Sequence, residues 1–212
     1  MNILIDSLPD DAMISGAAWP INSSFFIGIQ FELLMQDAEL TDKERVGQAL
    51  ALYYPQVPPD VEAAMEGLLW FYSCGRSTPK AKEPQKKTAA RQKAKKTQKA
   101  YCFEQDADLI FSAFWECYGI DLNEVEGLHW WKFRALFAGL PSECEFCKVM
   151  GYRTADTAGL SKKQKQYYER MKKLHALKNQ MDVAAALTLA ERNQSMKDYV
   201  ARRFAEVEGT QN

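Results

Sequence analysis

The sequence predicts an all-α protein in which two small helical domains are joined by a basic flexible linker and followed by a C-terminal helical tail. Apolar residues recur at three- and four-residue spacing in several stretches that are long enough for helices. Most of these stretches begin at a residue that can cap a helix and end at Gly or Pro. Residues 76–100 differ from all of them, because ten are Lys or Arg and none is a large apolar residue.

These patterns divide the chain into four segments. They are an N-terminal helical bundle with a short arm at 1–75, a Lys-rich linker at 76–100, an aromatic-cored helical domain at 101–158 and a basic helical tail at 159–212. Residues 1–75 hold eleven acidic and two basic side chains, a net charge of −9, whereas the linker holds one acidic and ten basic, a net charge of +9. The linker cannot bury enough apolar surface to offset the entropy of ordering it, so we expect the parts on either side to fold independently.

The N-terminal segment is expected to hold a short arm and three helices. Asn2-Ile3-Leu4-Ile5 predicts an edge strand or a packed extended arm. The first helix should run from Asn22 or Ser23, its cap, to about residue 37. The second begins at Thr41, since Thr41-Asp42-Lys43-Glu44 has the form of a capping box. The third begins at Pro58-Pro59-Asp60 and ends at Cys74-Gly75. One face of the first helix is expected to carry Phe26, Ile29, Leu33 and Gln36.

The aromatic-cored domain begins with a helix from about Asp106 to Tyr118, which Gly119 ends. The next stretch, residues 128–137, places two tryptophans and two phenylalanines within ten residues. We expect it to be a helix entered through the acidic residues 121–126 and ended by Gly139-Leu140-Pro141. Aromatic residues occupy most of its circumference, so it should be enclosed by other helices. A short helix follows from about Ser142 to Met150.

The tail is expected to form two helices. Ser161-Lys162-Lys163-Gln164 has the form of a capping box, and the helix that it begins reaches about Lys178 with seven basic residues and one acidic residue. A last helix is expected from about 182 to 207. Neither apolar stripe has a partner in its own segment, so we expect the two helices to pack as an antiparallel hairpin. The alternative is a partly disordered tail that orders on binding.

The sequence contains no evident catalytic constellation, so we expect no enzymatic activity, no metal and no cofactor. A structural role is expected for His129 in the aromatic stretch, and a solvent-facing position for His175. Cys144-x-x-Cys147 lacks the second ligand pair that a zinc site needs, which favours structural cysteines. No stretch approaches 18 uncharged apolar residues, so no membrane span is expected. Five cysteines, an odd number without a regular framework, suit a reducing cytoplasm.

Six motifs spread over residues 20–155 add a different kind of observation. They are residues 31–35 (FELLM), 69–75 (LWFYSCG), 103–108 (FEQDAD), 118–122 (YGIDL), 128–136 (LHWWKFRAL) and 148–153 (KVMGYR). Together they resemble the tailed-phage protein family named for gene product fifteen, which is found in long-tailed phages and prophages. Members of that family usually lie in the tail-assembly gene region, near the tape-measure gene. The resemblance therefore implies a tail assembly chaperone in the host cytoplasm.

The resemblance also implies partners. A tail assembly chaperone coats the long, apolar, helical tape-measure protein until tail-tube subunits polymerise around it. Self-association, or association with a shorter form of the chain, is a further expectation, whereas a membrane or nucleic acid is not expected as a partner. The alternatives are a structural tail or connector component retained in the virion, and a nucleic-acid-binding module that uses the basic linker. The candidate partner-binding residues are Trp130, Trp131, Arg134, Tyr167, Met171 and Leu174.

The two tryptophans are expected to differ, because adjacent positions on a helix point about 100° apart. We expect one indole to lie in the core and the other to line a groove for the partner.

Overall fold

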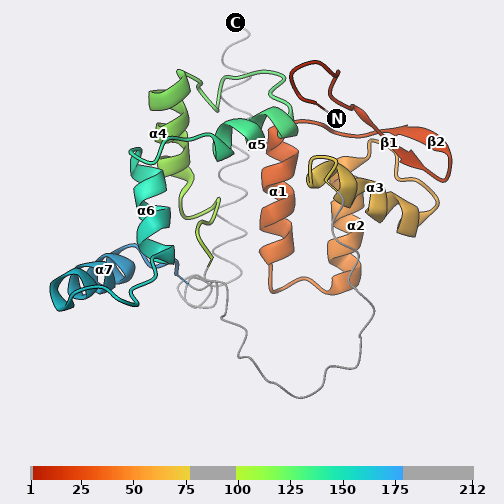
Figure 1. Ribbon diagram of the computed structural model, residues 1–212. Helices are drawn as coiled ribbons and strands as arrows, with labels where there is room; N and C mark the ends of the chain where they lie inside the picture. Colours follow the sequence, from red (N-terminus) through yellow and green to blue (C-terminus); the bar gives the residue numbers. More distant parts are fainter. Residues whose placement is uncertain (1, 77–98, 179–212) are drawn as a thin grey trace, which may run out of the picture. The chain divides into compact units, whose positions relative to one another are not determined.

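The computed structural model describes residues 2–76 and 99–178 (Figure 1). Most of the predicted linker and the predicted last helix at 182–207 lie outside the described residues, and so does the predicted hairpin of the tail. The chain divides into two compact units, Met1–His175 and Ala176–Asn212. The described residues lie in the first unit, apart from residues 176–178.

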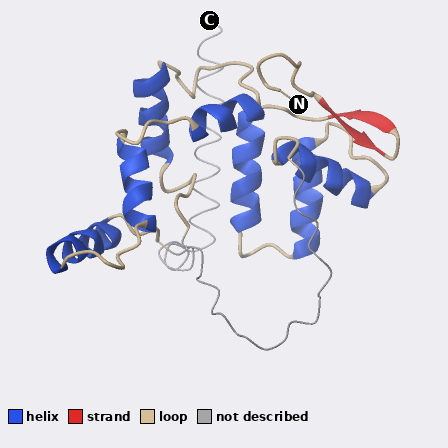
Figure 2. Cartoon of the chain, viewed as in Figure 1, coloured by secondary structure: helices blue, strands red, loops and turns tan. Residues whose placement is uncertain are grey.

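The protein is mostly helical, but the all-α prediction is wrong in one detail, a two-stranded antiparallel hairpin (Figure 2). Its strands are β1, Asp11–Ile14, and β2, Ala17–Pro20. The turn residues Ser15 and Gly16 both have positive φ angles, of 48° and 84°, as a tight two-residue hairpin turn requires. Ala12 and Ile14 alternate with exposed neighbours and are buried, so the hairpin lies with one face on the core.

The arm before the hairpin is neither a strand nor packed. The N–H groups of Ile5 and Asp6 donate to the carbonyl of Asn2, which closes a turn. Leu4 and Ile5 are largely exposed. The strand or packed arm predicted at residues 2–5 is therefore wrong, because the chain folds back on itself there instead of extending.

The first three helices lie close to their predicted positions. They are α1, Phe25–Gln36, α2, Asp42–Tyr53, and α3, Val61–Tyr72. The capping box at Thr41 is confirmed, since its hydroxyl accepts from the Glu44 N–H and the Glu44 carboxylate accepts from the Thr41 N–H.

Helix α1 differs from its prediction in its cap and in its face. Its N-cap is Ser24, one residue later than expected, and that side chain makes no capping hydrogen bond. The buried residues are Phe25, Gly28 and Phe31, whereas Phe26 is half exposed. Of the predicted face, Ile29 and Leu33 are partly buried against the core, whereas Phe26 is not. Helix α1 is apolar nearly all round, so the spacing alone does not single out one buried face.

Four helices follow among the described residues after 99. They are α4, Ala107–Tyr118, α5, Trp130–Ala138, α6, Glu145–Thr154, and α7, Lys162–Leu174. Gly119 ends α4 in the left-handed conformation, as predicted. The capping box of Ser161 and Gln164 at the start of α7 is also confirmed.

Four predicted boundaries in this part are wrong, among them the end of α6, which lies at Thr154 instead of near Met150. Helix α5 begins only at Trp130, because the acidic stretch before it forms turns in which Glu124 and Val125 donate to the carbonyl of Asp121. Helix α6 is capped by Cys144 rather than by Ser142. Helix α7 ends at Leu174, several residues before Lys178.

The parts before and after the predicted linker share one hydrophobic core. Helix α1 packs against α5, and the backbones join at this contact, where Phe25 N–H donates to Leu128 O (3.0 Å) and Trp130 N–H donates to Ser23 O (2.7 Å). The Phe25 and Phe133 rings stack with centroids 5.1 Å apart. The independent folding that we expected does not agree with this shared core. The boundaries of the four predicted segments stay predictions.

Gly28 is the closest point of the contact between α1 and α5. A Cβ atom added at this glycine would lie 2.2 Å from Trp130 Cε3, a distance that real side chains do not tolerate. Gly28 therefore allows the indole of Trp130 to lie directly on the backbone of α1.

We predict that Gly28→Ala lowers the free energy of unfolding by about 1–3 kcal/mol, because the added methyl group overpacks the core against Trp130. Gly47→Ala is the matched control, since Gly47 also lies within a helix and has no atom within 4 Å of its added Cβ. The control should be neutral or stabilising by up to about 1 kcal/mol. Chemical denaturation monitored by tryptophan fluorescence measures both, and equal stability of the two variants would contradict the predicted contact.

Candidate functional site

His129 fixes the start of the aromatic helix. Its Nδ1 accepts a hydrogen bond from the N–H of Trp131 at 3.0 Å, so the imidazole is the N-cap of α5. Its Nε2 donates to the carbonyl of Pro9 at 3.1 Å. Burial lowers the pKa of His129, which agrees with a neutral ring that accepts at one nitrogen and donates at the other. The imidazole thus ties α5 to the chain just before the hairpin.

Trp130 and Trp131 are both buried. The indole N–H of Trp130 donates to the carbonyl of Tyr72 at 2.9 Å, and that of Trp131 donates to the carbonyl of Phe71 at 2.7 Å. Two neighbouring indoles therefore bind two neighbouring carbonyls at the C-terminal end of α3. The expectation that one of the two would line an exposed groove is wrong, because both hydrogen bonds draw the rings inward.

Arg134 lies on the outer side of this cluster and is half buried. Its guanidinium carbon is 5.5 Å from the centroid of the Trp130 ring, within the range of a cation–π contact. Its Nη1 donates to the hydroxyl of Tyr101 at 3.3 Å. The Tyr72 ring stacks on the same Trp130 ring. The hydroxyl of Tyr72 donates to the Glu32 carboxylate at 2.5 Å. Burial, and then the hydrogen bond to Glu32, raise the pKa of Tyr72.

The other three candidate residues lie on α7. Tyr167 is 50% exposed and Leu174 is 70% exposed, while Met171 is partly buried. No residue of α7 is buried. A capping box at one end and a regular helical backbone nevertheless hold these side chains in one orientation, since they fall at i, i+4 and i+7. Helix α7 thus presents an apolar stripe that α6 covers in part, since the hydroxyl of Tyr167 donates to that of Tyr152 at 3.3 Å.

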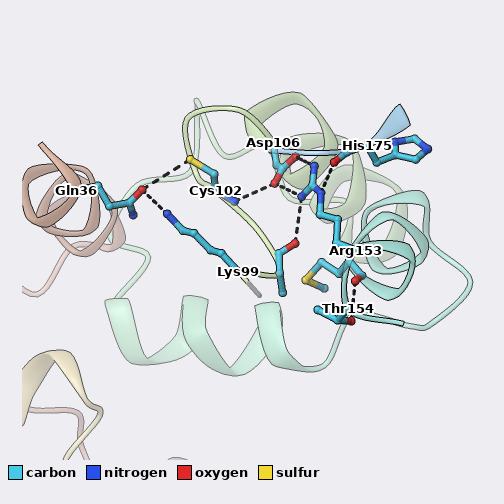
Figure 3. A network of polar contacts seen from close by, with 9 residues as sticks. Gln36, Lys99, Cys102, Asp106, Arg153, Thr154 and His175 are labelled. Carbon is cyan, nitrogen blue, oxygen red and sulfur yellow. Dashed lines mark hydrogen bonds and ion pairs between the residues drawn. The ribbon is translucent and has the colours of Figure 1, made fainter. Parts of the chain in front are cut away.

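The end of α7 is anchored to the rest of the unit by a buried ion pair (Figure 3). Both Nη atoms of Arg153 bind the carboxylate of Asp106, at 2.6 and 2.8 Å, and both side chains are buried. The same guanidinium donates from Nε to the carbonyl of His175 at 2.6 Å and from Nη1 to the carbonyl of Ala100 at 3.1 Å. The Asp106 carboxylate also accepts from the Cys102 N–H at 2.9 Å.

This network gathers four separate parts of the chain around one charge pair. Asp106 is the N-cap residue of α4, Arg153 lies in the last turn of α6, Ala100 precedes α4, and His175 caps α7. His175 also stacks on Tyr152 and is half buried, so the expected solvent-facing position is wrong. No local pattern predicts the ion pair, because its partners are 47 residues apart.

The cysteine pair serves the local structure of α6. Cys144 is the N-cap, and its Sγ accepts from the N–H of Cys147 at 3.4 Å. Burial raises the pKa of Cys147 to about 11, and its thiol lies 3.7 Å from the carbonyl of Leu140, to which it donates. In residues 2–76 and 99–178, no group of three or more His, Cys, Asp and Glu side chains could hold a metal ion.

The structure thus separates the six candidate residues into two groups. The first group belongs to the packing between α3, α1 and α5 and consists of Trp130, Trp131 and Arg134. The second group forms the apolar stripe of α7, which packs beside α6, and consists of Tyr167, Met171 and Leu174. A partner-binding role of all six stays a prediction, but only the α7 group offers accessible apolar surface. Two exposed aromatic residues were not singled out from the sequence, namely Trp70 and Trp115.

Comparison with known proteins gives one match. A protein-family model described as Bacteriophage Gp15 protein matches residues 4–177, which is most of the chain and includes all six motifs quoted above. No curated protein and no solved structure matches the chain.

We predict that Arg153→Met lowers the free energy of unfolding by about 3–5 kcal/mol, because it leaves the Asp106 carboxylate buried without its partner. Lys165→Met is the matched control, since the Lys165–Glu169 pair is exposed and its charged atoms are 3.9 Å apart. Loss of that pair should cost no more than about 0.5 kcal/mol. Denaturant titration measures both variants. A loss below about 1 kcal/mol for Arg153→Met would show that the network does not anchor the fold.

A second prediction concerns pH. The pKa of His129 is lower in the folded chain than the ordinary value of about 6.5 expected when it is unfolded. Its contribution to stability is therefore present above that value and is lost as the pH falls through the folded pKa, when protonation of Nδ1 would break the cap. Between pH 7.5 and 5, the native chain should lose more stability than His129→Asn, which can still cap α5. Parallel pH profiles of the two proteins would contradict this role.

Proposed function

The chain belongs to the bacteriophage Gp15 protein family, and from this premise we propose that it is a non-enzymatic tail assembly chaperone that binds the tape-measure protein during tail morphogenesis. The site of action would be the host cytoplasm, where tails assemble. The described residues contain no helix that is both long and apolar enough to cross a bilayer. The binding itself would be reversible, since the client must be released when the tail tube forms.

The observation that carries this proposal is the exposed apolar stripe of α7. A helical client offers apolar residues at three- and four-residue spacing, and a second helix with a matching stripe can cover them. Tyr167 and Leu174 supply apolar area that is already ordered on a capped helix, so little conformational entropy is lost on binding. Met171 adds an unbranched side chain that adapts to different client residues.

The aromatic cluster supports this function indirectly. Trp130, Trp131 and Arg134 hold α5 against α3 and α1, and they are the least accessible of the candidate residues. In this proposal they maintain the body that presents α7. Coverage of a client requires exposed apolar surface and modest affinity, and it requires no catalytic group.

The alternative roles can be separated from this one by direct measurement. A structural tail or connector component would remain in the particle, so mass spectrometry of purified virions should detect it in stoichiometric amounts. A nucleic-acid-binding module would show binding that weakens steeply with salt, because phosphate contacts release counterions. The basic residues of α7 favour testing this second alternative.

We predict that the full chain, co-expressed with the tape-measure protein of the same phage, co-purifies with it, and that Tyr167→Ser combined with Leu174→Ser weakens the complex at least about tenfold. Each large apolar side chain contributes about 1.5–3 kcal/mol when it is fully buried, and 1.4 kcal/mol is a tenfold change in affinity. Calorimetry or interferometry with a tape-measure fragment gives the affinity.

Leu4→Ser combined with Ile5→Ser is the matched control, since these apolar side chains are also exposed but belong to the N-terminal arm and not to α7. It should bind like the native chain. Equal affinity of the native chain and the α7 variant would place the client elsewhere, and absence of any complex would remove the chaperone proposal.

A further inference from the structure

Helix α7 carries charge as well as apolar surface on its outer face. Four residues of this helix have sequence spacings of four, three and four and therefore lie on one side of it, namely Lys163, Tyr167, Arg170 and Leu174. All four are exposed. We call them the α7 face. It combines two positive charges with two large apolar side chains over three turns.

Helix α3 carries a face of the opposite charge. This face consists of four exposed residues with sequence spacings of four, three and one, namely Glu62, Glu66, Leu69 and Trp70. Leu69 is 45% and Trp70 is 39% exposed, which is much for large apolar side chains on a helix whose other side is fully buried. We call these residues the α3 face. Its backbone is well anchored, because Asp60 caps α3 and the two indole hydrogen bonds reach its last carbonyls.

Both faces keep much of their surface exposed among the described residues, although the Tyr167 ring contacts Tyr152 of α6 and the Trp70 ring packs edge to face on Trp131. The buried side of α3 packs against β1 and α2, and α7 packs against α6. Exposure of such an apolar face to water is unfavourable. A helix that carries apolar residues and the opposite charge would cover both the apolar and the charged residues of the face.

We propose that the α7 face of one copy docks on the α3 face of a second copy. Leu174 and Tyr167 would lie against Trp70 and Leu69, while Lys163 and Arg170 would meet Glu62 and Glu66. The same complementarity holds over a larger scale, since residues 1–75 carry a net charge of −9 and residues 161–178 carry seven basic side chains against one acidic. Opposite fields of this kind orient two copies before they touch.

The contact is heterologous, because it joins two different surfaces. Each copy then still presents one free face of each kind, so further copies can add until the array closes as a ring or continues as an open chain. A single pair of helix faces buries less than the roughly 800 Å² per partner that is usual for a stable complex, so the association should be weak and dependent on concentration. This inference concerns the purified chain alone and does not depend on the proposed function.

The same residues bear on client binding. Tyr167 and Leu174 would be covered by α3 of a neighbouring copy when no client is present, and a tape-measure helix would have to compete with that contact. Self-association would thus protect the apolar stripe of α7 between rounds of client binding.

A charge-swap experiment on the full chain tests the contact. Sedimentation velocity of the native protein should give a mass above the 24.2 kDa of one chain, rising with protein concentration and falling as salt is added. Glu62→Lys with Glu66→Lys should shift the protein to the monomer, and so should Lys163→Glu with Arg170→Glu. Each double substitution should weaken association at least about tenfold, since two attractive contacts become repulsive.

An equimolar mixture of the two variants should regain the native association, because the reversed α7 face of one variant matches the reversed α3 face of the other. Glu124→Lys with Glu126→Lys is the control, since these exposed loop residues undergo the same change in charge outside both faces. It should associate like the native chain. Circular dichroism and the thermal midpoint check that every variant is folded.

Three outcomes would overturn the proposal. They are a native chain that stays monomeric at all concentrations, association that survives in both face variants, and a mixture of folded variants that stays monomeric.

Discussion

The structure depends on two buried indole N–H groups that must find acceptors. A helix leaves its last carbonyls without partners in the helix, and a tryptophan in the core needs an acceptor for its N–H. Both requirements are satisfied by the same hydrogen bonds. Phe71 and Tyr72 are the final residues of α3, and their carbonyls accept from the indole N–H groups of Trp131 and Trp130. The two pairs are 60 and 58 residues apart in the chain. This junction forces the sequence after the lysine-rich segment to fold onto the sequence before it.

The helices themselves could largely be predicted from the sequence, because their signals are local. Capping boxes at Thr41 and Ser161 need only four residues, and Gly119 marks the end of α4 by its backbone conformation. The hairpin was missed because each strand has only four residues and because Ser15-Gly16 is a weak turn signal. The start of α5 was misplaced because an acidic run can open a helix or form a turn, and tertiary contacts of His129 decided between them.

The candidate site was predictable only where it does not depend on distant contacts. The apolar stripe of α7 follows from spacing alone, and the structure places it as an exposed helix face. The burial of both tryptophans could not be deduced, since a helical wheel shows directions but not what lies there. Gly28 is the clearest case. From the sequence, a glycine within α1 only lowers the helix propensity, whereas the structure shows that it makes room for the Trp130 ring. Likewise, Asp106 serves as the partner of Arg153 as well as the start of α4.

The shared core also determines how the chain can be cut. Gly75 lies beside the ring of Trp131, Lys99 binds Gln36, and Ala100 binds Arg153, so the chain is held to one body on both sides of residues 77–98. For the same reason, a polypeptide divided there should survive as two fragments that complement each other, which would let either half be labelled or exchanged separately.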